Sequence, residues 1–229
     1  MFLIPGLGGA DGRLSRATVT RFSLYLRHLE EVLSKGIQKV SSKQMGEAIG
    51  ITDAQVRKDL ACLGNLGHPG IGYASEELIA AIRHVLGIDR VWSVALVGVG
   101  NLGRALLRYK GFQARGFRIV ALFDSDPALI GQQLQGLTVR GLEDMTETIK
   151  AHNVELGLIA VPSDSAQFVA DSLVEAGIRG LLNFAPVVVR VPPEVSLVAV
   201  DLTVQLEQLA FHVHTSDAPL RQRTLYPVV

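Results

Sequence analysis

The sequence predicts a two-domain α/β protein: a winged helix-turn-helix domain, then a Rossmann-type doubly wound parallel sheet and a C-terminal helix. Three observations predict it: two capped helical segments in tandem near residue 50, a G-x-G-x-x-G motif near residue 100, and apolar runs that alternate with helical patterns beyond it. We expect the following division: a flexible arm at 1–14, the winged domain at 15–87, the sheet domain at 88–200, a helix at 201–215 and a loose tail at 216–229.

The composition is typical of a folded, soluble protein. The chain has 229 residues, of which 48% are hydrophobic, and a formal net charge of zero, which gives no global sign of a nucleic-acid partner. Its apolar runs are too short to span a bilayer, and its start lacks the basic residues and cleavage site of a signal peptide. The single Cys62 excludes an intramolecular disulfide and fits a reducing cytoplasm; we expect a small buried hydrophobe.

The first domain opens with a long amphipathic helix over 15–35, whose apolar residues recur at intervals of three and four. The motif SSKQ at 41–44 is a capping box before a short helix, and TDAQ at 52–55 is a second box before a helix over 54–63. Ser75 is expected to cap a further helix over 76–86, which links the domains. Two capped helices joined by a short turn predict a helix-turn-helix, whose second helix reads DNA.

This second helix carries polar side chains beside its apolar stripe. They are Gln55, Arg57, Lys58 and Asp59, residue types that reach base edges and phosphates, although a solvated helix face is the plainer interpretation. The Gly- and Pro-rich segment 65–73 predicts a β-hairpin wing, but with His68-Pro69 where a wing usually has a basic residue. We therefore expect double-stranded DNA as a partner, contacted by Lys43, Gln55, Arg57, Lys58, His68 and Tyr73.

The glycine motif lies in the setting that dinucleotide binding requires. An apolar strand at 94–97 leads into Gly98, Gly100 and Gly103, and a helix over 101–109 follows. In such a motif the first glycine allows the tight turn, the second lets the backbone approach a pyrophosphate, and the third permits close helix–strand packing. The phosphates would bind the N–H groups at the helix N-terminus. A glycine-rich turn that binds nothing is the alternative.

The next strands complete the predicted site. Asp124 ends the strand 117–123, where a carboxylate holds ribose hydroxyls and repels a 2′-phosphate, so we expect NAD(H) rather than NADP(H). A strand at 156–161 ends at Val161-Pro162, and another precedes Ala185-Pro186. Ligands of such sheets bind at the carboxyl ends of the strands, which assigns these segments to the second half of the dinucleotide.

The last predicted helix, over 201–212, has an apolar stripe of Leu202, Leu206, Leu209 and Ala210. It could pack on its own domain or on a partner chain, and we expect the partner chain, since a single helix-turn-helix usually reads DNA as a dimer. His212 and His214 are spaced i, i+2 and point to different sides of the helix, so we expect no metal site.

With a helix-turn-helix before an NAD motif, the chain resembles the redox-sensing transcriptional repressor Rex family. The segments that carry the resemblance are VRKDL at 56–60, GIGY at 70–73, VGVGNLG at 97–103, FDSDP at 123–127 and NFAP at 183–186. The resemblance implies a homodimer on an inverted-repeat operator that NADH releases while NAD⁺ competes, with the C-terminal helix swapped between subunits. It also implies no catalytic residues and a cytoplasmic location.

The resemblance implies roles for individual residues. Arg57 and Lys58 look like the DNA-contacting pair, while Arg27 and Asp201 match a pair that bridges domains and subunits differently in the two states. The residues that it and the strand ends assign to the cofactor are Gly98, Gly100, Asn101, Leu102, Gly103, Tyr109, Asp124, Val161, Pro162, Phe184, Ala185, Pro186 and Leu202.

The sequence departs from the family pattern at several positions. Leu202 replaces an aromatic residue that covers the nicotinamide from the other subunit, Leu63 replaces an aromatic before Gly64, and Lys110 replaces a proline. A Rex-like DNA-binding protein with an altered or lost redox response, or one that binds another adenine nucleotide, therefore stays open. An NAD-dependent oxidoreductase is a weaker alternative, because His152 and Tyr109 are the only nearby acid–base candidates and no substantial substrate domain follows the sheet.

Overall fold

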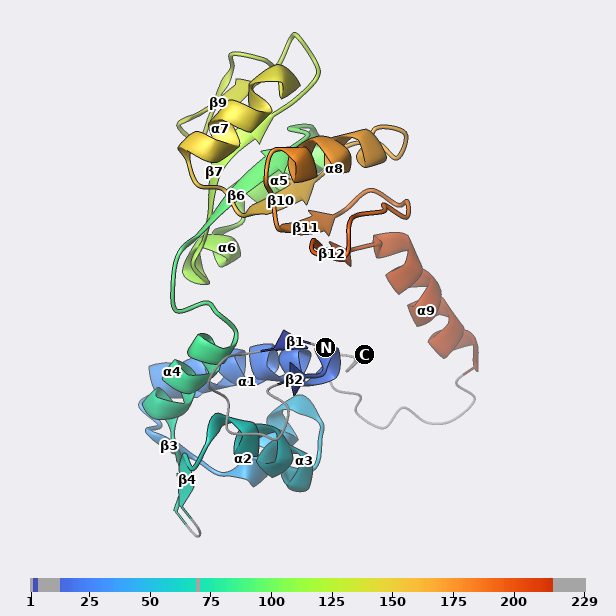
Figure 1. Cartoon of the computed structure of the whole chain (residues 1–229). Helices are drawn as coiled ribbons and strands as arrows, with labels where there is room; N and C mark the ends of the chain where they lie inside the picture. Colours follow the sequence, from blue (N-terminus) through green and yellow to red (C-terminus); the bar gives the residue numbers. More distant parts are fainter. Residues whose placement is uncertain (1, 4–12, 69–70, 216–229) are drawn as a thin grey trace. The chain divides into compact units, whose positions relative to one another are not determined.

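The computed structural model describes residues 2–3, 13–68 and 71–215 of the chain. The described residues divide into two compact units, with the boundary between Asp89 and Arg90 (Figure 1). The boundary falls two residues beyond the predicted end of the first domain.

The first unit is a helix-turn-helix with a small antiparallel sheet. Its sheet has the strand order β3-β5-β4, and the hairpin of β4 and β5 is the predicted wing. The elements are α1 (Arg16–Ser34), β3 (Lys39–Val40), α2 (Ser42–Ile49), α3 (Asp53–Leu60), the 3₁₀ helix η1 (Ala61–Leu63), β4 (Gly67–His68), β5 (Gly72–Ala74) and α4 (Ser75–Val85). The winged helix-turn-helix prediction is thus confirmed.

The core of this unit collects apolar side chains from all four helices. The apolar residues of the core with at most 4% exposure are Phe22, Tyr25, Leu26 and Leu29 of α1, Val40 of β3, Met45 and Ile49 of α2, Val56 and Leu60 of α3, and Leu78 and Ile82 of α4. Burying each large apolar side chain stabilises the fold by roughly 1.5–3 kcal/mol. The short helices α2 and α3 are therefore held mainly by packing, above all against each other.

Two local predictions for this unit need correction. The helix expected over 54–63 is α3 followed by η1, because the chain tightens before Gly64 takes a left-handed φ of 93°. Ser75 does not cap α4; it is the first helical residue, and its hydroxyl donates to the Ile37 carbonyl at 3.1 Å. Thr52 does cap α3, at 3.2 Å from the Gln55 N–H.

The two ends of the arm that we expected to be flexible, at 1–14, form strands that pair with each other. Strand β1 (Phe2–Leu3) pairs antiparallel with β2 (Arg13–Leu14), and Leu14 is buried in the core of the unit. The segment 4–12 and the tail predicted at 216–229 lie outside the described residues.

The second unit is built on a seven-stranded sheet of order β12-β11-β10-β6-β7-β9-β8, in which only the β8–β9 pair is antiparallel. Without β8 this is the 3-2-1-4-5-6 order of a dinucleotide-binding Rossmann fold, with the topological switch between β6 and β10. The strands are β6 (Trp92–Val97), β7 (Phe117–Phe123), β8 (Gln133–Leu134), β9 (Leu137–Arg140), β10 (Leu156–Ile159), β11 (Gly180–Asn183) and β12 (Ser196–Ala199). The predicted doubly wound sheet is confirmed.

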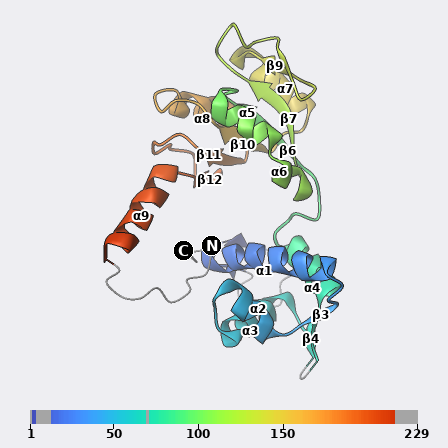
Figure 2. The same ribbon diagram turned by 180° about the vertical axis from the view of Figure 1, so that it is seen from behind.

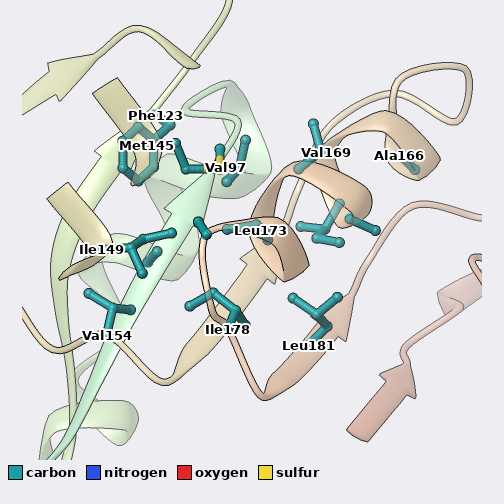
Figure 3. Close-up of a cluster of buried hydrophobic side chains, with 14 of the residues drawn as sticks. Val97, Phe123, Met145, Ile149, Val154, Ala166, Val169, Leu173, Ile178 and Leu181 are labelled. Atoms are coloured by element: carbon teal, nitrogen blue, oxygen red, sulfur yellow. The ribbon is translucent and has the colours of Figure 1, made fainter. Parts of the chain in front are cut away.

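Helices cover both faces of the sheet. Figure 1 shows α7 (Met145–Ala151) and α8 (Ala166–Glu175) on one face, and Figure 2 shows α5 (Asn101–Arg108) and α6 (Lys110–Ala114) on the other. Figure 3 shows side chains of α7 and α8, such as Ile149 and Leu173, packed against Val97 and Leu181 of the sheet. This packing fixes the strands whose carboxyl ends carry the predicted site.

Several elements of this unit were not predicted. The turn between β8 and β9 has positive φ at Gln135 and Gly136, as a two-residue hairpin requires, but Gln is a weak signal where Asn is usual. Helix α7 has only seven residues, so its apolar pattern is too short to distinguish from other structures. It also lacks a side-chain cap that would have marked its start. The 3₁₀ helix η2 (Leu142–Asp144) leads into α7, and α6 follows α5 after a break at Tyr109.

Helix α9 (Leu202–Thr215) follows the edge strand β12, and all its residues are exposed. Its most exposed apolar side chains are Leu202, Leu206, Leu209, Phe211 and Val213. No helix in the described part of the chain is long and apolar enough to cross a membrane.

Candidate nucleotide site and nucleic-acid interface

The glycine loop lies at the carboxyl end of β6, beside the switch point of the sheet. Gly98 has a left-handed φ of 91°, and a Cβ there would lie 2.5 Å from the Ala160 carbonyl oxygen of the neighbouring strand end. A Cβ on Gly103 would collide with the Gly98 carbonyl oxygen, whereas a Cβ on Gly100 would meet no atom within 4 Å. Gly98 and Gly103 are therefore required for the close packing of the loop against its neighbours. Gly100 leaves open space at the N-terminus of α5, where a phosphate fits.

Asp124 joins the next strand end to this loop. Its Oδ2 accepts the Val99 N–H at 2.7 Å, and its Oδ1 accepts the Asp126 N–H at 3.0 Å. Each carboxylate oxygen keeps a second lone pair, so Asp124 can still accept ribose hydroxyls. Arg104 adds a contact that the sequence did not indicate: its Nε donates to the Val99 carbonyl at 2.9 Å, so the peptide groups on both sides of Val99 are held by side chains.

The ends of β10 and β11 lie next to the glycine loop. Val161 is half-buried, and its Cγ1 would lie 2.9 Å from a Cβ on Gly98. The Phe184 N–H donates to the Ile159 carbonyl at 2.9 Å, which ties the loop after β11 to the end of β10. The structure thus brings this part of the predicted set to one edge: Gly98, Gly100, Asn101, Leu102, Gly103, Asp124, Val161, Pro162, Phe184, Ala185 and Pro186.

The loop after β11 is shaped by Asn183, which is 1% exposed. Its Nδ2 donates to the carbonyls of Ala185 and Val187, both at 3.1 Å, and its Oδ1 accepts the Ala185 N–H at 2.9 Å. Because all three hydrogen bonds of its side chain go to the backbone, Asn183 supports the loop, and the neighbouring Phe184 packs partly against the core of the sheet.

Two residues of the predicted cofactor set are not brought to this edge within one chain. Tyr109 ends α5 at 58% exposure and borders the cavity that also contains Phe117 and Arg118, the amino end of β7. Leu202 begins α9 and is 64% exposed. Because α5 runs antiparallel to β6, the last turn of α5 lies at the opposite edge of the sheet from the glycine loop, and the assignment of Tyr109 to the cofactor stays a prediction.

The predicted DNA-contacting cations lie on exposed parts of the helix-turn-helix. Arg57 of α3 bonds the Asp53 carboxylate at 2.5 Å and the Ser42 hydroxyl of α2 at 3.2 Å, and its hydrogen bond lowers the pKa of Asp53. Lys58 is exposed beside it, and Lys43 lies on α2 with Glu47 at 3.9 Å. Arg57 is thus preoriented at the junction of the two helices.

Two other polar residues of α3 do not lie on this face. Asp59 is 4% exposed and accepts both Nε and Nη2 of Arg21, at 2.5 and 2.7 Å, together with the Tyr25 hydroxyl at 2.8 Å. Gln55 donates its amide to Asp59 Oδ1 at 2.8 Å, so it does not complete the predicted capping box. The expectation that α3 displays Asp59 on its exposed face is wrong. Asp59 is buried, because Arg21 of α1 stabilises its carboxylate in the interior of the unit.

The charges around Asp59 also change the acid–base properties of their neighbours. The hydrogen bond to Asp59 raises the pKa of Arg21, and burial, with the same carboxylate nearby, raises the pKa of Tyr25. Both side chains are therefore held in their protonated, donating forms. Sequence reasoning missed this cluster, although an Arg and a Tyr four residues apart on an otherwise apolar helix face are a usable signal.

The wing borders a cavity of about 580 Å³, which is also lined by Arg57 and Ser42. Tyr73 of β5 lies in its wall and packs over Gly67, where a Cβ would come within 2.6 Å of the ring. The backbone of His68 belongs to β4, whereas Pro69 lies outside the described residues.

The predicted switch residues belong to different units. Arg27 is exposed on α1, and Asp201 caps α9 by accepting the Thr203 N–H at 2.9 Å. Their pairing stays a prediction. No cluster of three or more His, Cys, Asp or Glu side chains suited to a metal occurs among the described residues.

Comparisons with known proteins agree on both units. The family model "Putative DNA-binding protein N-terminus" matches residues 13–61, and the model "CoA binding domain" matches residues 89–187. The redox-sensing transcriptional repressor Rex of Desulfitobacterium hafniense is 48% identical over 90% of this chain and 98% of its own length. The Rex of Carboxydothermus hydrogenoformans is 46% identical over 88% of this chain and 97% of its own.

Solved structures extend the similarity to the fold. The crystal structure of RSP in complex with beta-NAD⁺ and operator DNA has a TM-score of 0.85 and 34% identity, and covers 88% of this chain and 93% of RSP. The structure of RSP, a Rex-family repressor, in complex with beta-NADH has a TM-score of 0.79 at the same identity, covering 88% of this chain and 94% of RSP. The chain therefore belongs to the redox-sensing transcriptional repressor Rex family.

Proposed function

We propose that this protein is a DNA-binding repressor that senses the NADH/NAD⁺ ratio, binds an inverted-repeat operator as a homodimer, and leaves it when NADH binds. The observation that carries the proposal is the coexistence, in one chain, of an exposed Arg57–Lys58 pair on α3 and an Asp124-anchored glycine loop. Relatives named as redox-sensing repressors, and the RSP structures with NADH and with operator DNA, support it. We place the protein in the cytoplasm, acting without catalysis.

The site residues fit NAD(H). Gly100 leaves room for the pyrophosphate, and the Asp124 carboxylate would accept ribose hydroxyls while repelling a 2′-phosphate. Val161, Pro162 and Phe184 would surround the nicotinamide with apolar groups. The oxidised ring carries a positive charge that the reduced ring lacks, so an apolar pocket disfavours NAD⁺ through desolvation.

Dimer formation is supported by two uncovered apolar surfaces of the second unit. One is α9, whose Leu202, Leu206 and Leu209 are each more than half exposed. The other is a hollow of about 330 Å³ on the α6 side of the sheet, lined by residues that include Phe112, Leu182 and Val198. We propose that α9 packs on a second copy, which would bring Leu202 near that copy's nicotinamide.

The response to NADH requires two arrangements of the dimer. In one, the two copies of α3 are spaced by about one turn of DNA, ~34–36 Å, and in the other they are not. NADH must bind the second arrangement more tightly, because a ligand with equal affinity for both shifts neither. Arg27 and Asp201 are the residues that we assign to this change.

The test is a fluorescence-anisotropy titration of the protein bound to an inverted-repeat operator, at fixed salt, with NADH, NAD⁺ and coenzyme A in separate arms. We expect release by micromolar NADH, and weaker or no release by the other two. Tight DNA binding that ignores all three would contradict redox sensing and indicate the insensitive Rex-like protein that Leu202 leaves open. Substrate-dependent NADH turnover would revive the oxidoreductase alternative.

A further inference from the structure

Helix α3 is anchored to α1 by a buried polar cluster, which we define as Arg21, Tyr25, Gln55 and Asp59. All three partners donate to the Asp59 carboxylate at 2.5 to 2.8 Å, and Arg21 binds it in a two-bond fork. Tyr25 has no exposed surface and its ring lies 6.2 Å from that of Phe22, so the donor side of the cluster is fixed in the core.

The apolar contacts of α3 constrain its rotation only weakly. The helix has eight residues, about 12 Å of length, and Val56 and Leu60 are its only buried apolar side chains. They lie one turn apart on a narrow stripe, and apolar packing is not directional. A charge-assisted fork, by contrast, restricts both distance and angle.

The geometry of the helix links this anchor to the exposed face. Successive residues are about 100° apart around the axis, so Arg57 lies about 200° and Lys58 about 100° from Asp59. A rotation of α3 that breaks the Arg21–Asp59 fork therefore turns both cations away from their native directions. The contact of Arg57 with Ser42 of α2, at 3.2 Å, would be broken as well.

We propose that Arg21 and Tyr25 are positioning residues of the DNA interface, which act through Asp59 to fix the rotation of α3 and hence the direction of Arg57 and Lys58. The inference deepens the proposed function and rests on it. Arg21, Tyr25 and Asp59 are buried and act without touching DNA. Its loss removes none of the exposed cations, so attraction to phosphates persists while discrimination between sequences falls.

The experiment compares the full-length wild type with Tyr25→Phe, which removes one hydroxyl, and Arg21→Lys, which keeps the charge but cannot form the fork. Arg83→Lys is the matched control, because Arg83 also pairs a helix with α1, bonding Glu30 at 2.9 Å without touching α3. Affinities for operator and scrambled duplexes are measured by anisotropy over a salt series, at a temperature where circular dichroism shows every variant folded.

We expect Arg21→Lys to lower the operator-to-scrambled affinity ratio by about tenfold or more, with scrambled-DNA affinity and its salt slope unchanged. Tyr25→Phe should lower the ratio less, and Arg83→Lys should leave it at the wild-type value. If the operator-to-scrambled affinity ratio is the same in Arg21→Lys, Tyr25→Phe and wild type, this inference is overturned while the proposed function stands. A wild type that does not prefer the operator would overturn the proposed function, and this inference with it.

A double variant separates positioning from stability. Arg21→Met with Asp59→Leu replaces the buried pair by apolar groups, a change that often preserves or raises stability. We expect a folded protein whose operator preference stays low. Restored preference would show that the cluster only stabilises the domain, and would overturn the positioning role.

Discussion

Asp124 and Val99 are joined by a 2.7 Å hydrogen bond from the Val99 N–H to the Asp124 carboxylate, so the residue assigned to the ribose also holds the glycine loop. We predict that Asp124→Ala weakens NADH binding by roughly 10- to 100-fold, since hydrogen bonds to a charged group contribute about 1.5–3 kcal/mol. Titration calorimetry of the isolated protein measures this change.

Operator affinity without cofactor is the control for Asp124→Ala, because Asp124 belongs to the second unit and Arg57 to the first. It should remain within about twofold of wild type. Loss of both affinities would indicate misfolding, and unchanged NADH binding would contradict the assignment of Asp124 to the ribose.

The glycine loop offers a matched pair of substitutions. We predict that Gly100→Ala folds normally but binds NADH at least about tenfold more weakly, because its methyl group enters space that we assign to the pyrophosphate. Gly98→Ala should instead lower the thermal midpoint, since Gly98 has a φ of 91° and no room beside Ala160. Thermal melts and NADH titrations of both variants test the distinction. Normal NADH affinity in Gly100→Ala would exclude a close approach of ligand there.

The sequence predicted those features that rest on local physical rules. The glycine loop follows from strand, turn and helix signals within ten residues, and Asp124 from its place at the end of the next strand. The structure puts both at one edge of the sheet because all the strands that carry the site are parallel.

Features that depend on distant partners could not be predicted in this way. Asp59 resembles an exposed recognition-helix residue until Arg21, 38 positions earlier, is seen to pair with it. Arg104 reads as an ordinary helical cation, and its bond to the Val99 carbonyl depends on the path of the loop. Tyr109 was assigned by resemblance alone, and the direction of α5 places it at the far edge of the sheet.

The two exposed cations of α3 should contribute to DNA binding in a salt-dependent manner. We predict that Arg57→Ala and Lys58→Ala each weaken operator binding, and that a variant that loses a phosphate contact reduces the slope of log affinity against log salt by about 1. Lys35→Ala is the control. Lys35 follows the last residue of α1, pairs with Glu31 of that helix and lies outside the predicted interface. Anisotropy titrations over a salt series measure both quantities. Wild-type affinity in Arg57→Ala would contradict the interface.

The thiol of Cys62 should be unreactive in the folded protein. Burial raises its pKa, so less of it is thiolate at a given pH, and its sulfur donates to the Asp59 carbonyl at 2.7 Å. A free cysteine ionises near pH ~8.5, and the reaction of native Cys62 should rise only at higher pH. We expect labelling by a thiol reagent at pH ~8 to be about tenfold slower in the native than in the unfolded chain. Equal rates would show that the thiol is accessible and not buried as described.

Helix α9 gives the sharpest test of the proposed dimer. Leu206 is 65% exposed, and its burial by a second copy would stabilise the dimer by about 1.5–3 kcal/mol per chain. We predict that Leu206→Glu shifts the protein toward monomer in sedimentation experiments, because the substitution removes the apolar contact and places a charge in the interface.

The matched control is Gln208→Glu, which adds the same charge to the same helix about 200° around its axis. It should leave the dimer intact. Since two half-sites are read together, the Leu206→Glu monomer should also bind the inverted repeat at least about tenfold more weakly, while its affinity for a single half-site is unchanged. If both variants remain dimeric, α9 is not the subunit contact, and the apolar hollow beside Phe112 and Val198 becomes the surface to mutate next.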